Sequence, residues 1–317
     1  MPAGRLGRQD ETSKQFEWDC HVASLLAMTK KKMTILLVII LLLFFSVGCT
    51  NKTKNTPENL APKTIRKDTT WSGKVTVDGL LTIVSGVTLY IKPGTIVEFT
   101  KRDKKGDDTK GSRIYSRGRI VAKGTKKKPI FFTSKAKKRG KGDWGEIKIE
   151  YSQGGSLFEY AVVEYGFWGV HAHFTRLTVR KSIFRNNTGG LRFRSGPVYL
   201  KDSLFTNNNT GVRFLIGKPT IEYNNMIKNR TGLFLTQQVE TSNIRFNNIE
   251  DNLEYDLQLG WMQDTDVYIP KNWWGTSDVA EIKKKTFDKS RDTDLGKAFF
   301  EPVLKKQVKV YEWVPKL

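Results

Sequence analysis

The chain has 317 residues, of which 38% are hydrophobic and 11% aromatic, and its formal net charge is +22. The aromatic content excludes a disordered chain, because disordered sequences are poor in the residues that build a packed core. The only cysteines are Cys20 and Cys49, which excludes a disulfide framework or a cysteine-based metal site in residues 71–317.

The positive charge belongs to the body of the chain, because residues 1–48 hold only six Lys/Arg and four Asp/Glu. A strongly basic protein attracts anions such as acidic glycans, lipopolysaccharide phosphates, anionic lipid headgroups or nucleic acid. General solubility is the alternative explanation of the same charge.

Residues 28–48 have the pattern of a secretory signal peptide. Three lysines at 30–32 precede an apolar run at 35–45, and a small residue, Gly48, comes before Cys49. The apolar run is shorter than the roughly 20 residues that span a bilayer. The ending Ser-Val-Gly-Cys at 46–49 resembles the bacterial lipoprotein box, although Ser46 stands where that family usually has Leu. The resemblance implies that Cys49 receives a diacylglycerol and becomes the first mature residue. An ordinary signal peptide or anchor with an incidental cysteine is the alternative.

The residues before and after the signal peptide can be assigned from their composition. Met28 begins a more natural signal peptide than Met1, so we expect residues 1–27 to be a mis-called start. The polar stretch over 49–70 predicts a flexible tether. Thr50 is not Asp, which in Gram-negative lipoproteins favours the outer membrane. We therefore expect a cell-envelope protein that its N-terminal lipid attaches to the outer membrane, facing the periplasm or the outside, in an oligomeric state that the sequence does not predict.

The middle of the chain is a repeat. Five similar segments start at Phe158, Val179, Leu200, Ile221 and Ile244, so that successive starts lie 21, 21, 21 and 23 residues apart. Each segment holds short strands with apolar residues at alternate positions, separated by the turn residues Asn, Gly, Asp and Thr. This period, with short strands and no helical stretch, predicts a parallel β-helix over 71–270 with one coil per repeat. A leucine-rich repeat has a similar period, but its LxxLxLxxN pattern is absent.

Asparagines recur at one turn of the repeat, at 186/187, 207/208 and 229. They predict left-handed backbone at that turn and stacked amides that hydrogen-bond along the axis. In the less regular first half, two polar insertions at 101–112 and 135–142 are predicted to project as loops.

Four motifs resemble the right-handed β-helix repeat proteins of bacterial envelopes, a broad group similar in fold to pectate lyases. They are GVTLYIKPGT at 86–95, GTKKKPIFFTS at 124–134, DWG at 143–145 and NWWG at 272–275. The resemblance covers 71–304 and implies an all-β fold, a right-handed parallel β-helix (solenoid). It implies no particular activity, because the group includes lyases, glycosidases and metal-delivery proteins.

Residues 271–317 are expected to cap the C-terminal end of the solenoid, whose last rung would otherwise be unpaired. A sugar-stacking platform at Trp273 and Trp274 is the alternative interpretation of that segment.

The alternation of the strands predicts a cluster of basic residues on the outer surface. If Val170, Leu191 and Val212 point inward, their neighbours in the chain point outward and stack from coil to coil. The resulting candidates for anion binding are His171, His173, Arg192, Arg194 and Arg213. Arginines in such a group can hold carboxylates, sulfates or phosphates bidentately. The alternative is that these strand positions are polar simply because they face solvent.

A second outward column is expected to be structural, because residues of opposite charge stand beside each other in a ladder. It contains Glu159, Arg180, Lys201, Glu222 and Arg245.

The sequence matches no enzyme template. Its acidic residues scatter over different columns, whereas a glycosidase needs paired carboxylates on one face. Two histidines without a third ligand predict no metal site, and no nucleotide fingerprint is present, so we expect no cofactor and no nucleic-acid partner. The first hypothesis is a non-catalytic, lipid-anchored envelope protein whose basic face binds an acidic polysaccharide, lipopolysaccharide or another envelope component. The second is a polysaccharide lyase or glycoside hydrolase that acts on an acidic polysaccharide with the same face.

Overall fold

The computed structural model describes residues 60–101, 111–239, 241, 243–310, 313 and 315. The predicted start at 1–27, the signal peptide at 28–48, Cys49 and the first part of the tether, up to residue 59, lie outside the described residues. Residues Pro57–Leu317 form one compact unit. Within the described ranges, no helix has both the length and the apolar character needed to cross a membrane.

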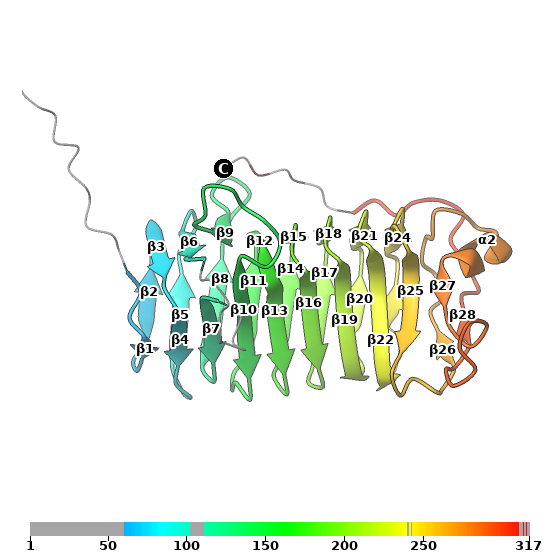
Figure 1. The fold of residues 1–317 in the computed structure, drawn as a ribbon, viewed down its shortest axis with the longest axis horizontal. Helices are drawn as coiled ribbons and strands as arrows, with labels where there is room; N and C mark the ends of the chain where they lie inside the picture. The colour runs from blue at the N-terminus through cyan, green and yellow to red at the C-terminus, as the bar shows by residue number, and fades with distance from the viewer. Residues whose placement is uncertain are drawn as a thin grey trace, which may run out of the picture. The chain divides into compact units, whose positions relative to one another are not determined.

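The chain winds through three parallel sheets in turn, and successive coils stack along one axis (Figure 1). Sheet 1 has ten strands: β1 (Thr64–Ile65), β4 (Leu80–Ile83), β7 (Arg113–Ser116), β10 (Trp144–Glu150), β13 (Gly166–His173), β16 (Gly189–Arg194), β19 (Thr210–Gly217), β22 (Thr231–Val239), β25 (Tyr255–Gly260) and β27 (Thr286–Phe287).

Sheets 2 and 3 have eight strands each. Sheet 2 consists of β2 (Thr69–Trp71), β5 (Thr88–Ile91), β8 (Arg119–Lys123), β11 (Ser156–Glu159), β14 (Leu177–Arg180), β17 (Val198–Lys201), β20 (Thr220–Glu222) and β23 (Ile244–Arg245). Sheet 3 consists of β3 (Lys74–Val77), β6 (Ile96–Phe99), β9 (Ile130–Ser134), β12 (Ala161–Glu164), β15 (Ile183–Arg185), β18 (Leu204–Thr206), β21 (Asn225–Ile227) and β24 (Asn248–Glu250). The predicted parallel β-helix is therefore confirmed.

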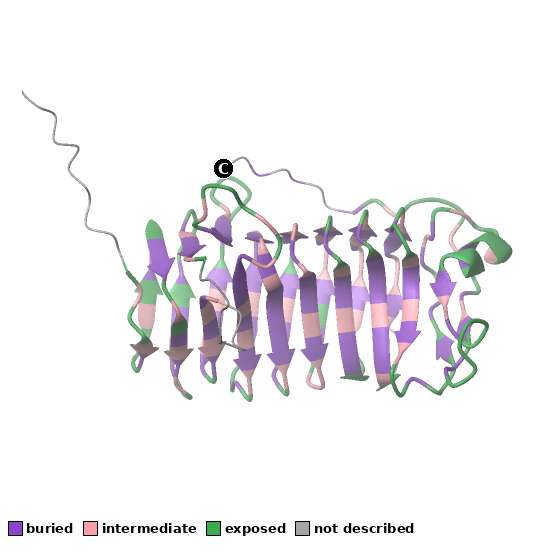
Figure 2. Cartoon of the chain, viewed as in Figure 1, coloured by how far each residue is buried: buried purple, intermediate pink, exposed green. Residues whose placement is uncertain are grey.

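Inward side chains form ladders along the axis, as the alternation predicted. Val170, Leu191, Val212 and Leu233 occupy equivalent positions in β13, β16, β19 and β22, and each is 0% exposed. Aromatic rings stack in the same way, with the rings of Phe184 and Phe205 4.9 Å apart. The buried residues therefore lie between the three sheets, and the exposed ones concentrate in the turns (Figure 2). Burial of this continuous apolar column is the main stabilising contribution.

Asparagine ladders line the turn between sheet 3 and sheet 1. Asn186 and Asn207 have φ of 56°, the left-handed geometry expected there. The buried amides that follow them bond from coil to coil, in the order Asn187, Asn208, Asn229 and Asn252. Each amide nitrogen also donates to a backbone carbonyl of the preceding coil, as Asn208 does to Phe184 at 3.0 Å. The predicted stacked amides are confirmed.

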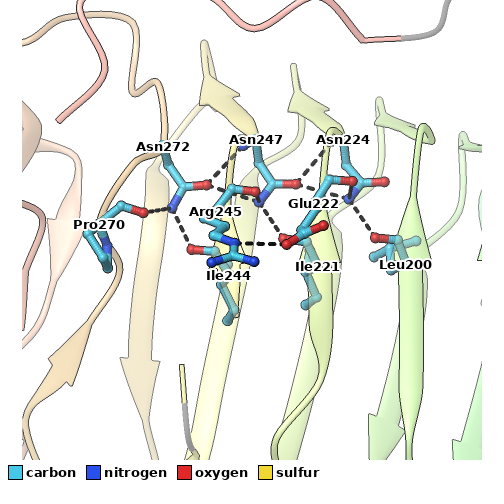
Figure 3. A network of polar contacts seen from close by, with 9 residues as sticks. All are labelled: Leu200, Ile221, Glu222, Asn224, Ile244, Arg245, Asn247, Pro270 and Asn272. Carbon is cyan, nitrogen blue, oxygen red and sulfur yellow. Dashed lines mark hydrogen bonds and ion pairs between the residues drawn. The ribbon is translucent and has the colours of Figure 1, made fainter. Parts of the chain in front are cut away.

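A second ladder, which the sequence did not predict, lines the turn between sheet 2 and sheet 3. It begins with Ser182 and Ser203 and continues through Asn224, Asn247 and Asn272. Figure 3 shows its asparagine part, with each side-chain amide bonded to the next. The ladder satisfies backbone groups that would otherwise be buried without partners.

The insertion predicted at 135–142 is a loop between β9 and β10, held by Asp143 at its end. The Asp143 carboxylate accepts hydrogen bonds from Ser134 Oγ and Gly140 N, and it lies 2.8 Å from Lys101 Nζ. Most of the insertion predicted at 101–112 lies outside the described residues.

The C-terminal part adds helix α2 (Val279–Lys284) and a two-stranded sheet of β26 (Val267–Tyr268) and β28 (Ala298–Phe299). Asn272 supplies the last amide of the second ladder. Trp274 is 3% exposed and packs edge-on against Phe300, whereas Trp273 donates a hydrogen bond to Glu250. The alternative of an open sugar-stacking platform is therefore wrong, because one of its two rings is buried.

Candidate anion-binding face

The structure brings all five predicted anion-binding residues together on the outer face of sheet 1. His171, Arg192 and Arg213 lie side by side in β13, β16 and β19. In the neighbouring column, His173 pairs with Arg194. These five residues are called the basic face below. They cluster because parallel pairing in register keeps equivalent positions adjacent from coil to coil.

The basic face is less exposed than outward strand positions were expected to be. His171 is only 6% exposed, and the other four residues are half-buried. Leu215 and Thr236 continue the second column and are buried as well. Neighbouring side chains therefore cover most of each position, although four of the five keep some contact with solvent.

The two histidines form a chain of short contacts with acidic residues of β10. His171 Nδ1 lies 2.8 Å from Glu146 Oε2, and His171 Nε2 lies 2.8 Å from His173 Nε2. On the other side, His173 Nδ1 lies 3.5 Å from Glu150 Oε1, and Tyr115 donates a hydrogen bond to the Glu150 carboxylate. This series of contacts links two carboxylates through two imidazoles, which fixes the orientation of both rings.

Nearby charges and burial shift the pKa values of the imidazole and carboxylate groups in this series of contacts. Burial and the positive charges nearby lower the pKa of His173 to about 4. Burial alone would raise the pKa of Glu146, but the hydrogen bond from His171 and the neighbouring cations hold it below its usual value. Near neutral pH, His173 is therefore an uncharged imidazole, while Glu146 is a carboxylate.

The three arginines have buried groups without partners. The Nε atoms of Arg192, Arg194 and Arg213 are shielded from solvent and make no hydrogen bond within the described part of the chain. Their guanidinium groups lie over aromatic rings, 5.8 Å from Trp168, 5.6 Å from Phe174 and 4.6 Å from Phe234 respectively. Burial lowers the pKa of Arg192 and of Arg213. Desolvated, closely spaced cations of this kind favour the arrival of an anion.

A pocket of about 510 Å³ opens beside this cluster. Its lining is rich in basic and aromatic residues, namely Arg113, Tyr115, Lys148, Trp168, His171 and Arg192, with Glu146 as its acidic member. Gly189 makes room for Trp168, since a Cβ at Gly189 would lie 2.2 Å from the indole ring. The volume falls within the range of small-ligand sites, which is roughly 300–1,000 Å³.

Sequence reasoning missed Glu146, Lys148 and Glu150. The pairing of β10 with β13 contains a register shift between Glu146 and Ile147, and the loop before β10 breaks the 21-residue period. The available signal was the alternation Glu-Ile-Lys-Ile-Glu at 146–150, which marks three outward polar positions. Among the described residues, no group of three or more His, Cys, Asp and Glu has the arrangement of a metal site.

The second predicted column is paired as expected. Glu159, Arg180, Lys201, Glu222 and Arg245 lie in register across sheet 2. Arg180 contacts Glu159 at 3.0 Å, and Arg245 contacts Glu222 at 2.8 Å, the latter visible in Figure 3. Both of these arginines therefore have a carboxylate of the neighbouring coil as a direct partner.

Comparison with protein families agrees with this architecture. Residues 63–152 match the family described as "Pectate-lyase like beta helix domain", and residues 143–268 match "Right handed beta helix region". The chain is a right-handed parallel β-helix. The matches support the pectate-lyase-like fold superfamily, as the motifs at 86–95 and 124–134 suggested. A search of the curated proteins and of the solved structures finds no match.

The fold alone does not decide what the β-helix binds, because unrelated functions share one fold. The site itself must carry that inference.

Proposed function

We propose that this β-helix binds an acidic polysaccharide, or another polyanion of the cell envelope, through its basic face. The observation that carries the proposal is that the buried Nε atoms of Arg192, Arg194 and Arg213 make no hydrogen bond to any residue that the structure describes. A buried donor that makes no hydrogen bond is unfavourable by roughly 1–3 kcal/mol. A sulfate or carboxylate of the ligand would supply the missing acceptors, and stacked arginines one coil apart, about 4.8 Å, would contact successive charges of a polymer.

The test compares heparin binding by the full chain and by the variant Arg192→Ala with Arg194→Ala. We expect the variant to bind at least about ten-fold more weakly near physiological salt, because it loses two charge-assisted contacts. The control variant, Lys283→Ala with Lys284→Ala on α2, removes the same charge from an exposed helix. Equal weakening by both variants would mean diffuse attraction and would overturn the proposal.

A conservative variant separates geometry from charge. Arg192→Lys with Arg194→Lys keeps the net charge but replaces the planar fork by a single ammonium group. We expect this variant to bind heparin more weakly than the unchanged chain and more tightly than the double alanine variant.

A second candidate function is a lyase that acts on an acidic polysaccharide at the same face. The observation that favours it is His173, which is uncharged near neutral pH and lies beside arginines able to neutralise a substrate carboxylate. A general base must be unprotonated and within reach of the proton that it removes. The test is the formation of unsaturated uronate from acidic polysaccharides, measured by ultraviolet absorbance. Turnover that is lost in His173→Gln supports the lyase, and the absence of turnover on alginate, polygalacturonate and heparin supports binding alone.

We also propose that the chain is a lipoprotein of the outer membrane, facing the periplasm or the outside. The support is the signal-like segment at 28–48 and the lipoprotein-box resemblance at Cys49. Expression in a Gram-negative host with labelled palmitate tests it. We expect label in the unchanged chain and none in Cys49→Ala, and unlabelled wild-type protein would contradict the proposal.

A further inference from the structure

The corner at which each coil passes from sheet 1 to sheet 2 carries a column of residues with left-handed backbone. Positive φ occurs at Tyr151 (52°), Phe174 (49°), Ser195 (50°), Ile216 (47°) and Met262 (60°). Tyr151, Phe174, Ser195 and Ile216 lie in successive coils, since Tyr151 N donates to His173 O and Phe174 N donates to Arg194 O. Gln237, which also has positive φ (63°), occupies the coil between those of Ile216 and Met262. In Figure 1 this corner is the lower edge, beyond the arrowheads of β10, β13 and β16.

Large apolar side chains are exposed along this corner. The exposed fractions are 54% for Tyr151, 41% for Phe174, 39% for Ile216, 66% for Trp261 and 57% for Met262. We call these five residues the apolar corner. The rings of Tyr151 and Phe174 stack 5.0 Å apart. Five coil steps of about 4.8 Å separate the coil of Tyr151 from that of Met262, so the corner extends for about 24 Å.

The backbone does not require apolar residues at such a corner. At the equivalent corner between sheet 3 and sheet 1, the positive-φ positions hold Tyr165, Asn186, Asn207, Lys228 and Asp251, and Tyr165, the one aromatic member, packs against the apolar core. Positive φ disfavours Ile and the aromatic residues, and water disfavours their exposure. The Tyr151–Phe174 stack and the Arg194–Phe174 contact cover only part of these side chains, so the apolar surface that stays exposed favours an external partner.

Positive charge flanks the apolar corner. Arg176 is exposed immediately after Phe174 in the chain, and the Arg194 guanidinium lies 5.6 Å from the Phe174 ring. Arg117 is exposed at the same corner of an earlier coil. Aromatic and aliphatic side chains interspersed with arginine favour the interface of an anionic bilayer, where the rings enter the headgroup region and the cations meet phosphates. A straight row of such side chains also suits a flat surface.

We propose that the apolar corner docks on the surface of an anionic lipid bilayer, so that the solenoid axis lies along the membrane. This site is separate from the attachment at Cys49 and from polyanion binding by the basic face.

The test uses the full chain with Cys20→Ser and Cys49→Ser, which removes both cysteines and any acylation. Met262→Cys then carries one environment-sensitive fluorophore. We expect a blue shift of its emission with vesicles of equal parts phosphatidylglycerol and phosphatidylcholine, and little shift with phosphatidylcholine alone. The matched control is Leu253→Cys, which is 76% exposed in the turn between β24 and β25, away from the corner. No shift at position 262, or an equal shift at 253, would overturn the proposal.

A variant of the corner gives a second readout. Trp261→Ser with Met262→Ser removes two side chains that are 66% and 57% exposed, so folding should be unaffected, as thermal unfolding would show. We expect the variant to bind vesicles at least about ten-fold more weakly. Heparin binding should be unchanged, because the basic face is intact. Unchanged vesicle binding would overturn the docking proposal, and loss of heparin binding alone would count against the basic face instead. If a protein partner binds through these two residues and vesicles cause no emission shift, the corner is the interface for that protein. This result would overturn lipid docking.

Discussion

The Nε2 atoms of His171 and His173 lie 2.8 Å apart, so that a single proton lies between the two rings. The other ring nitrogen of His171 faces the Glu146 carboxylate at 2.8 Å. A proton on His173 would therefore meet a buried environment and the positive charges of Lys148 and Arg192. This relationship explains why the basic face contains an imidazole that stays uncharged among cations.

The first prediction concerns stability in acid. The folded-state pKa of His173, about 4, lies below the ordinary value of 6.5, so the unfolded chain binds more protons between these two pH values. The contribution of His173 is fully present above pH 6.5, and it is lost as pH falls toward 4. Its size is up to about 3 kcal/mol, from 1.36 kcal/mol per pKa unit. Chemical denaturation at several pH values measures it.

The control for acid stability is His173→Gln, which cannot take up a proton. We expect the variant to lose less stability than the unchanged chain between pH 7 and pH 4. Parallel stability curves for the two proteins would show that His173 titrates normally, and would remove the reason for regarding it as a neutral base.

The second prediction concerns the first asparagine ladder. Asn208 Oδ1 accepts from the backbone N–H and the amide of Asn187, and its Nδ2 donates to Phe184 O and to Asn229 Oδ1. Asn208→Ala leaves several of these buried groups unpaired, so we expect the free energy of unfolding to fall by about 2–4 kcal/mol. Asn209→Ala is the matched control, because Asn209 is exposed and its side chain accepts a hydrogen bond from the exposed Lys141, at 3.1 Å. It should change stability by about 0.5 kcal/mol or less. Similar losses in both variants would contradict a special role for the ladder.

The fold was predictable because each coil repeats the same local rules. Alternation placed Val170 and Leu191 inside, and the 21-residue spacing placed equivalent residues beside each other. The second ladder was missed because its members change chemical type, from Ser203 to Asn224, although serine and asparagine oxygens accept the same backbone N–H. A pattern search by residue identity does not detect this equivalence, whereas a search by hydrogen-bonding capacity would.

The candidate site was only partly predictable. The 21-residue spacing was sufficient to predict the positions of Arg192 and Arg213, which lie in regular coils. It could not predict the position of Glu146, because a register shift follows that residue. Burial of an outward position such as His171 depends on the size of neighbouring side chains and cannot be derived from alternation. The apolar corner was not predicted because its residues differ in type, and four of the five share only a positive φ, which the sequence pattern did not indicate.

The third prediction concerns Asp256, which ends the first asparagine ladder. Its Oδ1 accepts from Asn252 Nδ2 at 2.8 Å, and burial raises its pKa to about 6. Because the folded-state pKa lies above the ordinary 3.8, stability is lost as pH rises from about 4 to 6. Asp256→Asn keeps the acceptor and removes the buried charge. We expect the variant to be more stable by about 1–3 kcal/mol at pH 8 and nearly equal at pH 4, as measured by denaturation. A variant that is less stable at pH 8 would contradict this prediction. It would mean that the Asp256 charge stabilises the fold, for example by attracting Lys285.

The fourth prediction separates the two proposed functions through Glu146→Gln. The change removes the carboxylate that faces His171 and attracts Arg192, so the basic face gains one positive charge while the side-chain shape is kept. If the face only binds, heparin affinity should rise about two- to five-fold at low salt, since nearby charge governs such association. If the face is a lyase site, turnover should fall at least about ten-fold, because His171 loses the carboxylate that orients its ring.

Glu159→Gln on sheet 2 makes the same change in charge beside Arg180, away from the face, and should leave both measurements nearly unchanged. A fall in heparin affinity in Glu146→Gln would mean that Glu146 holds His171 and Arg192 in their binding positions, and that arrangement, rather than net charge, determines what the face recognises.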